Sequence, residues 1–157
     1  MMWRFLGSLS VLVAMPLMAS PIDGGLAAYA AGDYRVARAQ FRPLADRGSA
    51  IAETMLGVMA AKGQGRAADP AAAVGWWLRA ANRGYPPAQL ALAKALAHGR
   101  GVAADPGQAW LWARLAAVGN GNGEAMALSI ALEKSFDGPL RARLKVELAA
   151  WRPWQAL

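Results

Sequence analysis

The chain has 157 residues, of which 56% are hydrophobic and 17% charged, with a net charge of +7 and no cysteine. These proportions exclude a disordered chain, which needs low hydrophobicity and high net charge. The lack of cysteine excludes a disulfide scaffold, a thiolate zinc site and a cysteine nucleophile. The one histidine, His98, excludes any metal site built on a pair of histidines.

Residues 1–19 have the features of an export signal. Arg4 precedes an apolar run of about 14 residues, whereas a helix that crosses a bilayer needs about 20. A short apolar run behind a positive charge is typical of a secretory signal peptide. We predict an exported, periplasmic protein cleaved after Ala19, whose mature chain begins near Ser20. Loss of Arg4 lowers the net charge from +7 to +6. An uncleaved anchor is the alternative.

The rest of the chain repeats with a period of 36 residues. Residues 67–84 align with residues 103–120, and residues 31–48 align one period earlier. The matched pairs include Asp69 with Asp105, Pro70 with Pro106, Ala73 with Ala109, and Trp76 with Trp112. Three passes at one spacing predict a repeat protein.

Each unit is predicted to contain two helices. The first covers about residues 50–62 and, one period later, about residues 87–98, and it ends at a G-x-G turn. The second begins at Asp-Pro, at residues 69–70 and 105–106, because aspartate is a preferred N-cap and proline suits the first helical position. Asp33 matches these aspartates. We expect all three to cap helices rather than to catalyse a reaction.

The end of the chain departs from the period. A one-residue insertion is expected within residues 119–123. Farther on, leucines 140, 144 and 148 and Trp151 recur every three or four residues, which predicts an amphipathic helix that covers the open end of the stack. The predicted segments are a signal peptide (1–19), three repeats (20–48, 49–84 and 85–120) and a partial repeat with a capping helix (121–157).

The order A-x-x-x-L, G-x-G, a short loop with D, then A-x-x-W-[WA]-x-x-A-A resembles the Sel-one-like repeat, a 36-residue relative of the tetratricopeptide repeat. The resemblance covers about residues 25–132. It implies an all-α fold: a right-handed α-α superhelix, or solenoid, of helix-turn-helix repeats with a C-terminal capping helix. Ala60 and Leu96 depart from the family, which usually has tyrosine there.

The resemblance also implies a non-catalytic adaptor or scaffold that binds a protein or peptide in the bacterial cell envelope. In such folds the first helices of the units line a concave surface. Carried onto this register, its solvent-facing residues are Thr54, Val58, Ala61, Leu90, Lys94 and Ala97. This mildly apolar strip with one cation suits an apolar or acidic segment. No catalytic residue, cofactor or metal is predicted, and the oligomeric state is left open.

The tryptophans admit a second interpretation. Four of them lie on the second helices of the units: Trp76, Trp77, Trp110 and Trp112. If these rings stack on sugars, the protein is an envelope glycan-binding or glycan-processing accessory factor. Their inward-facing positions in the repeat favour a role in the core instead.

The positive charge raises the question of anionic partners. Several basic residues fall at helical spacing on the second helices: Arg35, Arg38, Arg42, Arg79 and Arg83. They are spread over the chain without the aromatic interleaving of a nucleic-acid fold. We therefore expect a solvated face, no nucleic-acid partner and no stable membrane insertion once the signal is cleaved.

Mass spectrometry of the protein recovered from the periplasm of an expressing bacterium checks the export prediction. An N-terminus near Ser20 is expected. A full-length product in the cytoplasm would contradict it.

Overall fold

The computed structural model describes residues 20–153, which form eight helices and no strand. The helices are α1 (Pro21–Ala30), α2 (Tyr34–Asp46), α3 (Ala50–Lys62), α4 (Pro70–Asn82), α5 (Pro86–His98), α6 (Pro106–Asn120), α7 (Gly123–Glu133) and α8 (Gly138–Ala150). The predicted signal peptide, residues 1–19, and residues 154–157 lie outside the described part.

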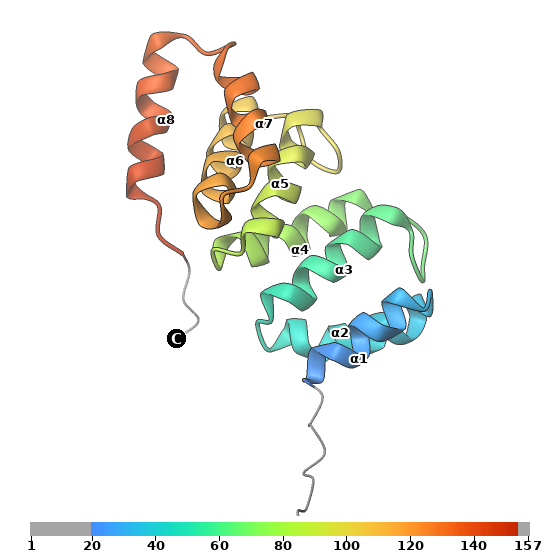
Figure 1. Cartoon of the computed structure of the whole chain (residues 1–157). Coiled ribbons are helices and arrows are strands. Elements are labelled where there is room, and N and C mark those ends of the chain that lie inside the picture. The colour runs from blue at the N-terminus through green and yellow to red at the C-terminus, as the bar shows by residue number, and fades with distance from the viewer. Residues whose placement is uncertain (1–19, 154–157) are drawn as a thin grey trace, which may run out of the picture.

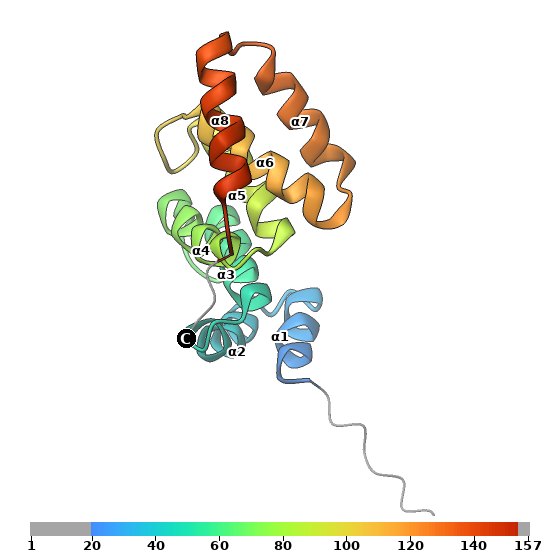
Figure 2. The ribbon, with the colours of Figure 1, turned by 90° about the vertical axis from the view of Figure 1, so that its left-hand side faces the viewer.

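The helices stack in two layers (Figures 1 and 2). From α1 to α7, each helix packs against the next along the chain, and α3 also contacts α5 directly. We call α1, α3, α5 and α7 the A layer, and α2, α4 and α6 the B layer. Successive A–B pairs follow one another as a solenoid, which confirms the predicted fold class.

Aspartates cap two of the B-layer helices, as predicted. Asp69 Oδ1 accepts a hydrogen bond from the Ala72 N–H, and Asp105 Oδ1 accepts one from the Gln108 N–H, each at 2.9 Å. The same prediction is wrong for Asp33, whose side chain makes no capping bond. The first unit lacks the long loop. Asp33 therefore follows a tight turn, with φ/ψ of −78°/63° instead of the −142°/86° of Asp69.

The second glycine of each G-x-G turn marks a contact between units. Gly65 and Gly101 have φ of 77° and 75°. The backbone of Tyr34 lies close to where a Cβ of Gly65 would be, and that of Pro70 stands in the same relation to Gly101. Both neighbours begin the B-layer helix of the preceding unit. Only glycine tolerates this φ together with so close an approach.

Small residues recur at the buried positions where the helices meet. Six alanines at the period are at most 5% exposed: Ala37, Ala73, Ala109, Ala45, Ala81 and Ala117. Gly57 on α3 leaves room for Trp77 of α4, because a Cβ at Gly57 would overlap the indole ring. One period later the two positions hold Ala93 and Ala113, both fully buried. The pair of a glycine and a tryptophan in one unit is thus replaced by two alanines in the next, so the facing helices stay closely packed with side chains of different size.

The last described helices close the stack. α6 is 15 residues long where α4 has 13, and its C-cap is Gly121 with a φ of 66°, in keeping with the expected insertion. α8 packs on α6. The predicted stripe is buried there, with Leu144 1% exposed and Leu140 and Leu148 packed around it.

Candidate functional site

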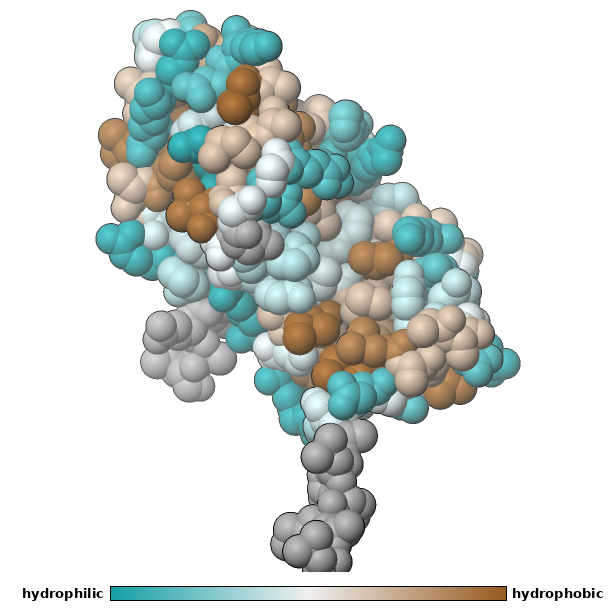
Figure 3. Space-filling view, in the orientation of Figure 1, coloured by the Kyte–Doolittle hydropathy of each residue, from teal (hydrophilic) through white to brown (hydrophobic). Residues whose placement is uncertain are grey.

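A groove of about 550 Å³ lies between α3 and α5, within the usual size range of binding pockets. Its residues come from both A-layer helices, from α4 and from the loop after α5: Val58, Ala61, Lys62, Pro70, Trp77, Pro87, Leu90, Ala91, Lys94, Ala95 and Arg100. Most are apolar. We call this cavity the α3–α5 groove. In Figure 3, hydrophobic side chains also gather over α1 and α3, where Leu26 and Ile51 are 38% and 40% exposed.

Four of the six residues predicted to bind a peptide line the α3–α5 groove: Val58, Ala61, Leu90 and Lys94. The groove is lined by the C-terminal part of α3 and by residues 87–95 of α5. The two helices therefore contribute different parts of their length. Thr54 and Ala97 do not line the groove. Thr54 is 8% exposed, and its hydroxyl donates to the Ala50 carbonyl at 2.7 Å. Ala97 packs on the central core.

The α3–α5 groove carries more positive charge than the predicted strip. Lys94 forms an ion pair with Glu124 of α7, with 2.6 Å between Nζ and Oε1. Lys62 and Arg100 also line the groove. Within residues 20–153, neither has a carboxylate at ion-pair distance. Sequence reasoning missed these two cations, because Lys62 ends its helix and Arg100 lies in a G-x-G turn.

Among residues 20–153, Glu53 is the one carboxylate side chain that the fold buries completely. Its Oε1 lies 2.9 Å from Nη2 of Arg79, and its Oε2 lies 3.4 Å from Nε of Arg83. Burial raises the pKa of Glu53 above its ordinary value of 4.5, although the charges of Arg79 and Arg83 act in the opposite direction. This carboxylate is therefore held inside the junction between α3 and α4 rather than presented to a substrate.

The same repeat position holds Gln89 one period later. Gln89 Nε2 donates a hydrogen bond to the Ala81 carbonyl at 3.2 Å, near the end of α4. The matching carbonyl one period earlier is that of Ala45. Since a carboxylate has no hydrogen to donate, Arg79 Nη2 donates to the Ala45 carbonyl instead, at 3.0 Å. Glu53 and Arg79 together therefore replace one glutamine.

The tryptophans do not gather on one surface. Trp110 and Trp112 are 2% and 7% exposed, which confirms their predicted place in the core. Trp76 and Trp77 are partly buried at the edge of the core: Trp77 packs against the central cluster, and Trp76 packs against the cluster formed by α2 and α3. Trp77 lines the α3–α5 groove, whereas Trp76 faces a different cavity beside α2. Adjacent residues on a helix point in different directions, and this separates the two rings.

Among residues 20–153, no three or more histidine, cysteine, aspartate or glutamate side chains come together in a way that could hold a metal ion. His98 is the exposed last residue of α5. None of the helices described here combines the length and the apolar character needed to cross a membrane.

The profile of the Sel1 repeat family matches residues 50–85 and 86–117. Residues 50–117 are thus similar to two consecutive Sel1 repeats. This confirms the predicted resemblance, and repeats of this family generally serve as scaffolds for protein interactions. None of the curated protein sequences matches the chain significantly.

Solved structures share the fold. A protective antigen present in uropathogenic Escherichia coli strains, which displays an SLR fold, matches with a TM-score of 0.78 and 23% identity, over 85% of this chain and 30% of its own. A Sel1 repeat protein from Oxalobacter formigenes matches with a TM-score of 0.67 and 26% identity, over 87% of this chain and 57% of its own. The chain thus spans about a third and somewhat over half of these proteins.

Gln89→Glu tests the inference that Glu53 and Arg79 together take the role that Gln89 has one period later. Leu115 and Gly119 stand where Arg79 and Arg83 stand one period earlier, so a carboxylate at position 89 is buried without a cation. The change should lower the free energy of unfolding by about 3 kcal/mol at pH 7.

The loss should shrink at pH 4. Without a cation, burial raises the folded pKa of the new carboxyl, so stability is retained below its unfolded pKa and is lost as the pH rises through the folded value. Urea unfolding at both pH values measures this. Gln40→Glu, on the exposed surface of α2, is the matched control and should change stability by less than about 0.5 kcal/mol. Equal losses in the two variants would refute the inference.

Proposed function

We propose that the protein is a non-catalytic adaptor that binds a protein or peptide segment in the bacterial cell envelope. The observation that carries the proposal is the α3–α5 groove, whose volume of about 550 Å³ is bounded mostly by apolar side chains. An apolar groove between two helices suits the apolar face of a third helix or an extended segment. The scaffold role of Sel1 repeats agrees with it.

The charges around the groove favour a partner with acidic residues. Lys62 and Arg100 line it without a carboxylate partner among the described residues, while Glu124 pairs with Lys94 at one side. An apolar segment that carries one or two carboxylates would therefore fill the groove and pair with its cations. Such charge complementarity contributes to orientation and to the rate of association more than to affinity.

The envelope location is part of this proposal. It is supported by the short apolar run behind Arg4 in residues 1–19, which is typical of a secretory signal. An exported chain meets its partners in the periplasm.

Ala61→Glu tests the groove. Ala61 is a partly buried wall residue, so a glutamate there adds both bulk and a negative charge. The partner that the wild type retains from envelope extract should be lost at least tenfold, as measured by quantitative mass spectrometry of the eluate.

Val146→Glu is the matched control. It adds the same charge on α8, where Val146 is 69% exposed, and should retain the partner. Thermal unfolding verifies that both variants are folded. Retention of the partner by folded Ala61→Glu would refute the groove as its binding site.

A further inference from the structure

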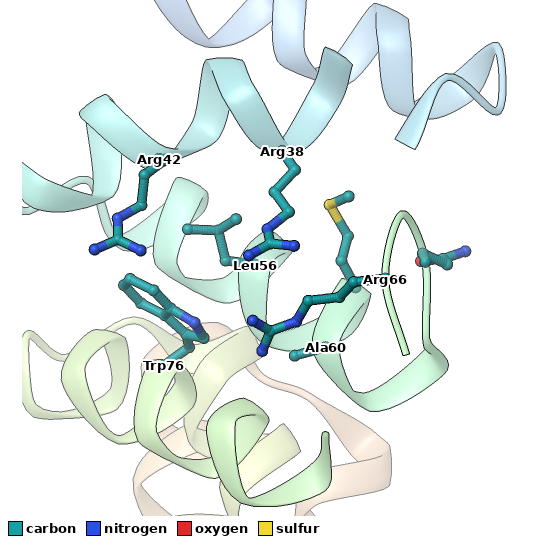
Figure 4. Close-up of a pocket in the computed structure, with 8 residues that line it drawn as sticks. Arg38, Arg42, Leu56, Ala60, Arg66 and Trp76 are labelled. Atoms are coloured by element: carbon teal, nitrogen blue, oxygen red, sulfur yellow. The ribbon is translucent and has the colours of Figure 1, made fainter. Parts of the chain in front are cut away.

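A second cavity opens in the other layer of the solenoid. It lies between the B-layer helices α2 and α4, over α3, and has a volume of about 40 Å³. Figure 4 shows Arg38 and Arg42 reaching from α2, and Arg66 reaching from the α3–α4 loop, toward Trp76, with Leu56 and Ala60 between them. We call this cavity the arginine pocket. Its arginines converge, which differs from the solvated face expected for Arg38 and Arg42.

The next unit contains the apolar counterpart of this pocket. The positions of Arg38, Arg42, Arg66 and Trp76 are taken one period later by Val74, Leu78, Val102 and Trp112. There Trp151, just after α8, packs edge-on against Trp112, with ring centroids 6.2 Å apart, and Val74 and Val102 pack against the same core cluster. The chain thus packs its own Trp151 at the apolar counterpart, whereas the arginine pocket stays open.

The charges in the arginine pocket do not cancel. Arg42 pairs with Asp46 at 3.1 Å, and Arg66 pairs with Asp69 at 3.5 Å. Arg38 has no carboxylate at ion-pair distance anywhere in residues 20–153. The pocket therefore keeps a net charge of about one positive unit.

Neighbouring groups hold the pocket in shape. The guanidinium groups of Arg79 and Arg42 lie over the Trp76 ring, 4.8 and 5.4 Å from its centre. Gln64 Oε1 accepts from the Tyr29 hydroxyl at 3.1 Å, which orients the Gln64 side chain at the pocket wall. Guanidinium donors around one small cavity match an oxyanion.

We propose that the arginine pocket binds the carboxylate of an acidic side chain on a partner peptide. One net positive charge balances a carboxylate but not a phosphate dianion. A bound water needs about 10–15 Å³ of such volume, so the cavity admits about three atoms of that size, and a carboxylate has three non-hydrogen atoms. Because a lone ion pair at a surface contributes little affinity, the carboxylate must belong to a longer chain that contacts the rims of α2 and α4. This proposal does not depend on the α3–α5 groove.

Nuclear magnetic resonance of the ¹⁵N-labelled protein, residue 20 onward, tests the proposal. The probe is hexaglutamate with blocked ends, added at 150 mM salt, and the reporter is the indole N–H of Trp76, assigned by its absence from Trp76→Phe. A saturable shift is expected with hexaglutamate and none with blocked hexaglutamine. Arg38→Gln should weaken binding at least tenfold, whereas Arg35→Gln, which removes the same charge from α2 outside the pocket, should change it less than twofold.

Three results would overturn the proposal. Equal weakening by Arg35→Gln and Arg38→Gln would show diffuse attraction to the basic surface. Tighter binding of inorganic phosphate than of hexaglutamate at the same reporter would assign the pocket to a different anion. No saturable shift with hexaglutamate in a protein whose spectrum is otherwise folded would show that the pocket binds no acidic peptide.

Discussion

The first two junctions of the solenoid depend on how the end of a B-layer helix is tied to a side chain of the next unit. At the end of α4, the Ala81 carbonyl accepts from Gly84 N–H and from the side chain of Gln89, which belongs to the following unit. At the end of α2, the Ala45 carbonyl accepts from Gly48 N–H and from Arg79. In each case a side chain of the next unit uses the second lone pair of a carbonyl and fixes the angle between units.

The third junction uses a different solution. Because α6 extends to Asn120, the Ala117 carbonyl accepts from Gly121 N–H at 3.0 Å. With the one-residue insertion, Met126 of α7 stands at the position of Glu53 and Gln89, and it has no hydrogen to donate. The three junctions therefore pack consecutive helices in the same order but hold a carboxylate, an amide and a thioether at the matching position. Only Glu53 adds a charge there.

Side chains of α4 that differ from those at the same repeat positions of α6 contribute to both candidate binding surfaces. Arg79 bridges Glu53 and the Ala45 carbonyl and also lies over Trp76, so the junction shapes one wall of the arginine pocket. Trp77, the next position on α4 after Trp76, fits against Gly57 and lines the α3–α5 groove. Neighbouring side chains on α4 therefore face opposite layers, and the junction contacts the arginine pocket through Arg79.

The period made the fold predictable, because helix caps, glycine turns and buried alanines are local features that recur. Asp33 shows the limit of this argument, since the missing loop alters the backbone that the cap requires. Four groove residues followed from the register, but where the groove ends depends on how α3 and α5 cross.

The Glu53–Arg79 pair was also missed, although the sequence holds a signal for it. Position 53 is acidic where position 79 is basic, and one period later Gln89 accompanies Leu115. When two positions of the repeat change together in this way, from an acid and a base to an amide and an apolar residue, the change indicates that the two side chains are in contact. The arginine pocket escaped notice for a similar reason, because its cations come from α2 and from a loop 24 residues beyond Arg42.

A double-mutant cycle on Glu53→Gln and Arg79→Leu tests the junction most directly. The two changes together reproduce the pair Gln89 and Leu115, while Arg83 is kept where the next unit has Gly119. The loss of Arg79 from Trp76 is common to both Arg79→Leu proteins and cancels. At pH 7, Glu53→Gln should raise the free energy of unfolding of Arg79→Leu by at least about 1 kcal/mol, since the amide can donate to the Ala45 carbonyl. If Glu53→Gln leaves Arg79→Leu equally stable or less stable, Arg79 does not replace the glutamine donor, and this account of the junction is wrong.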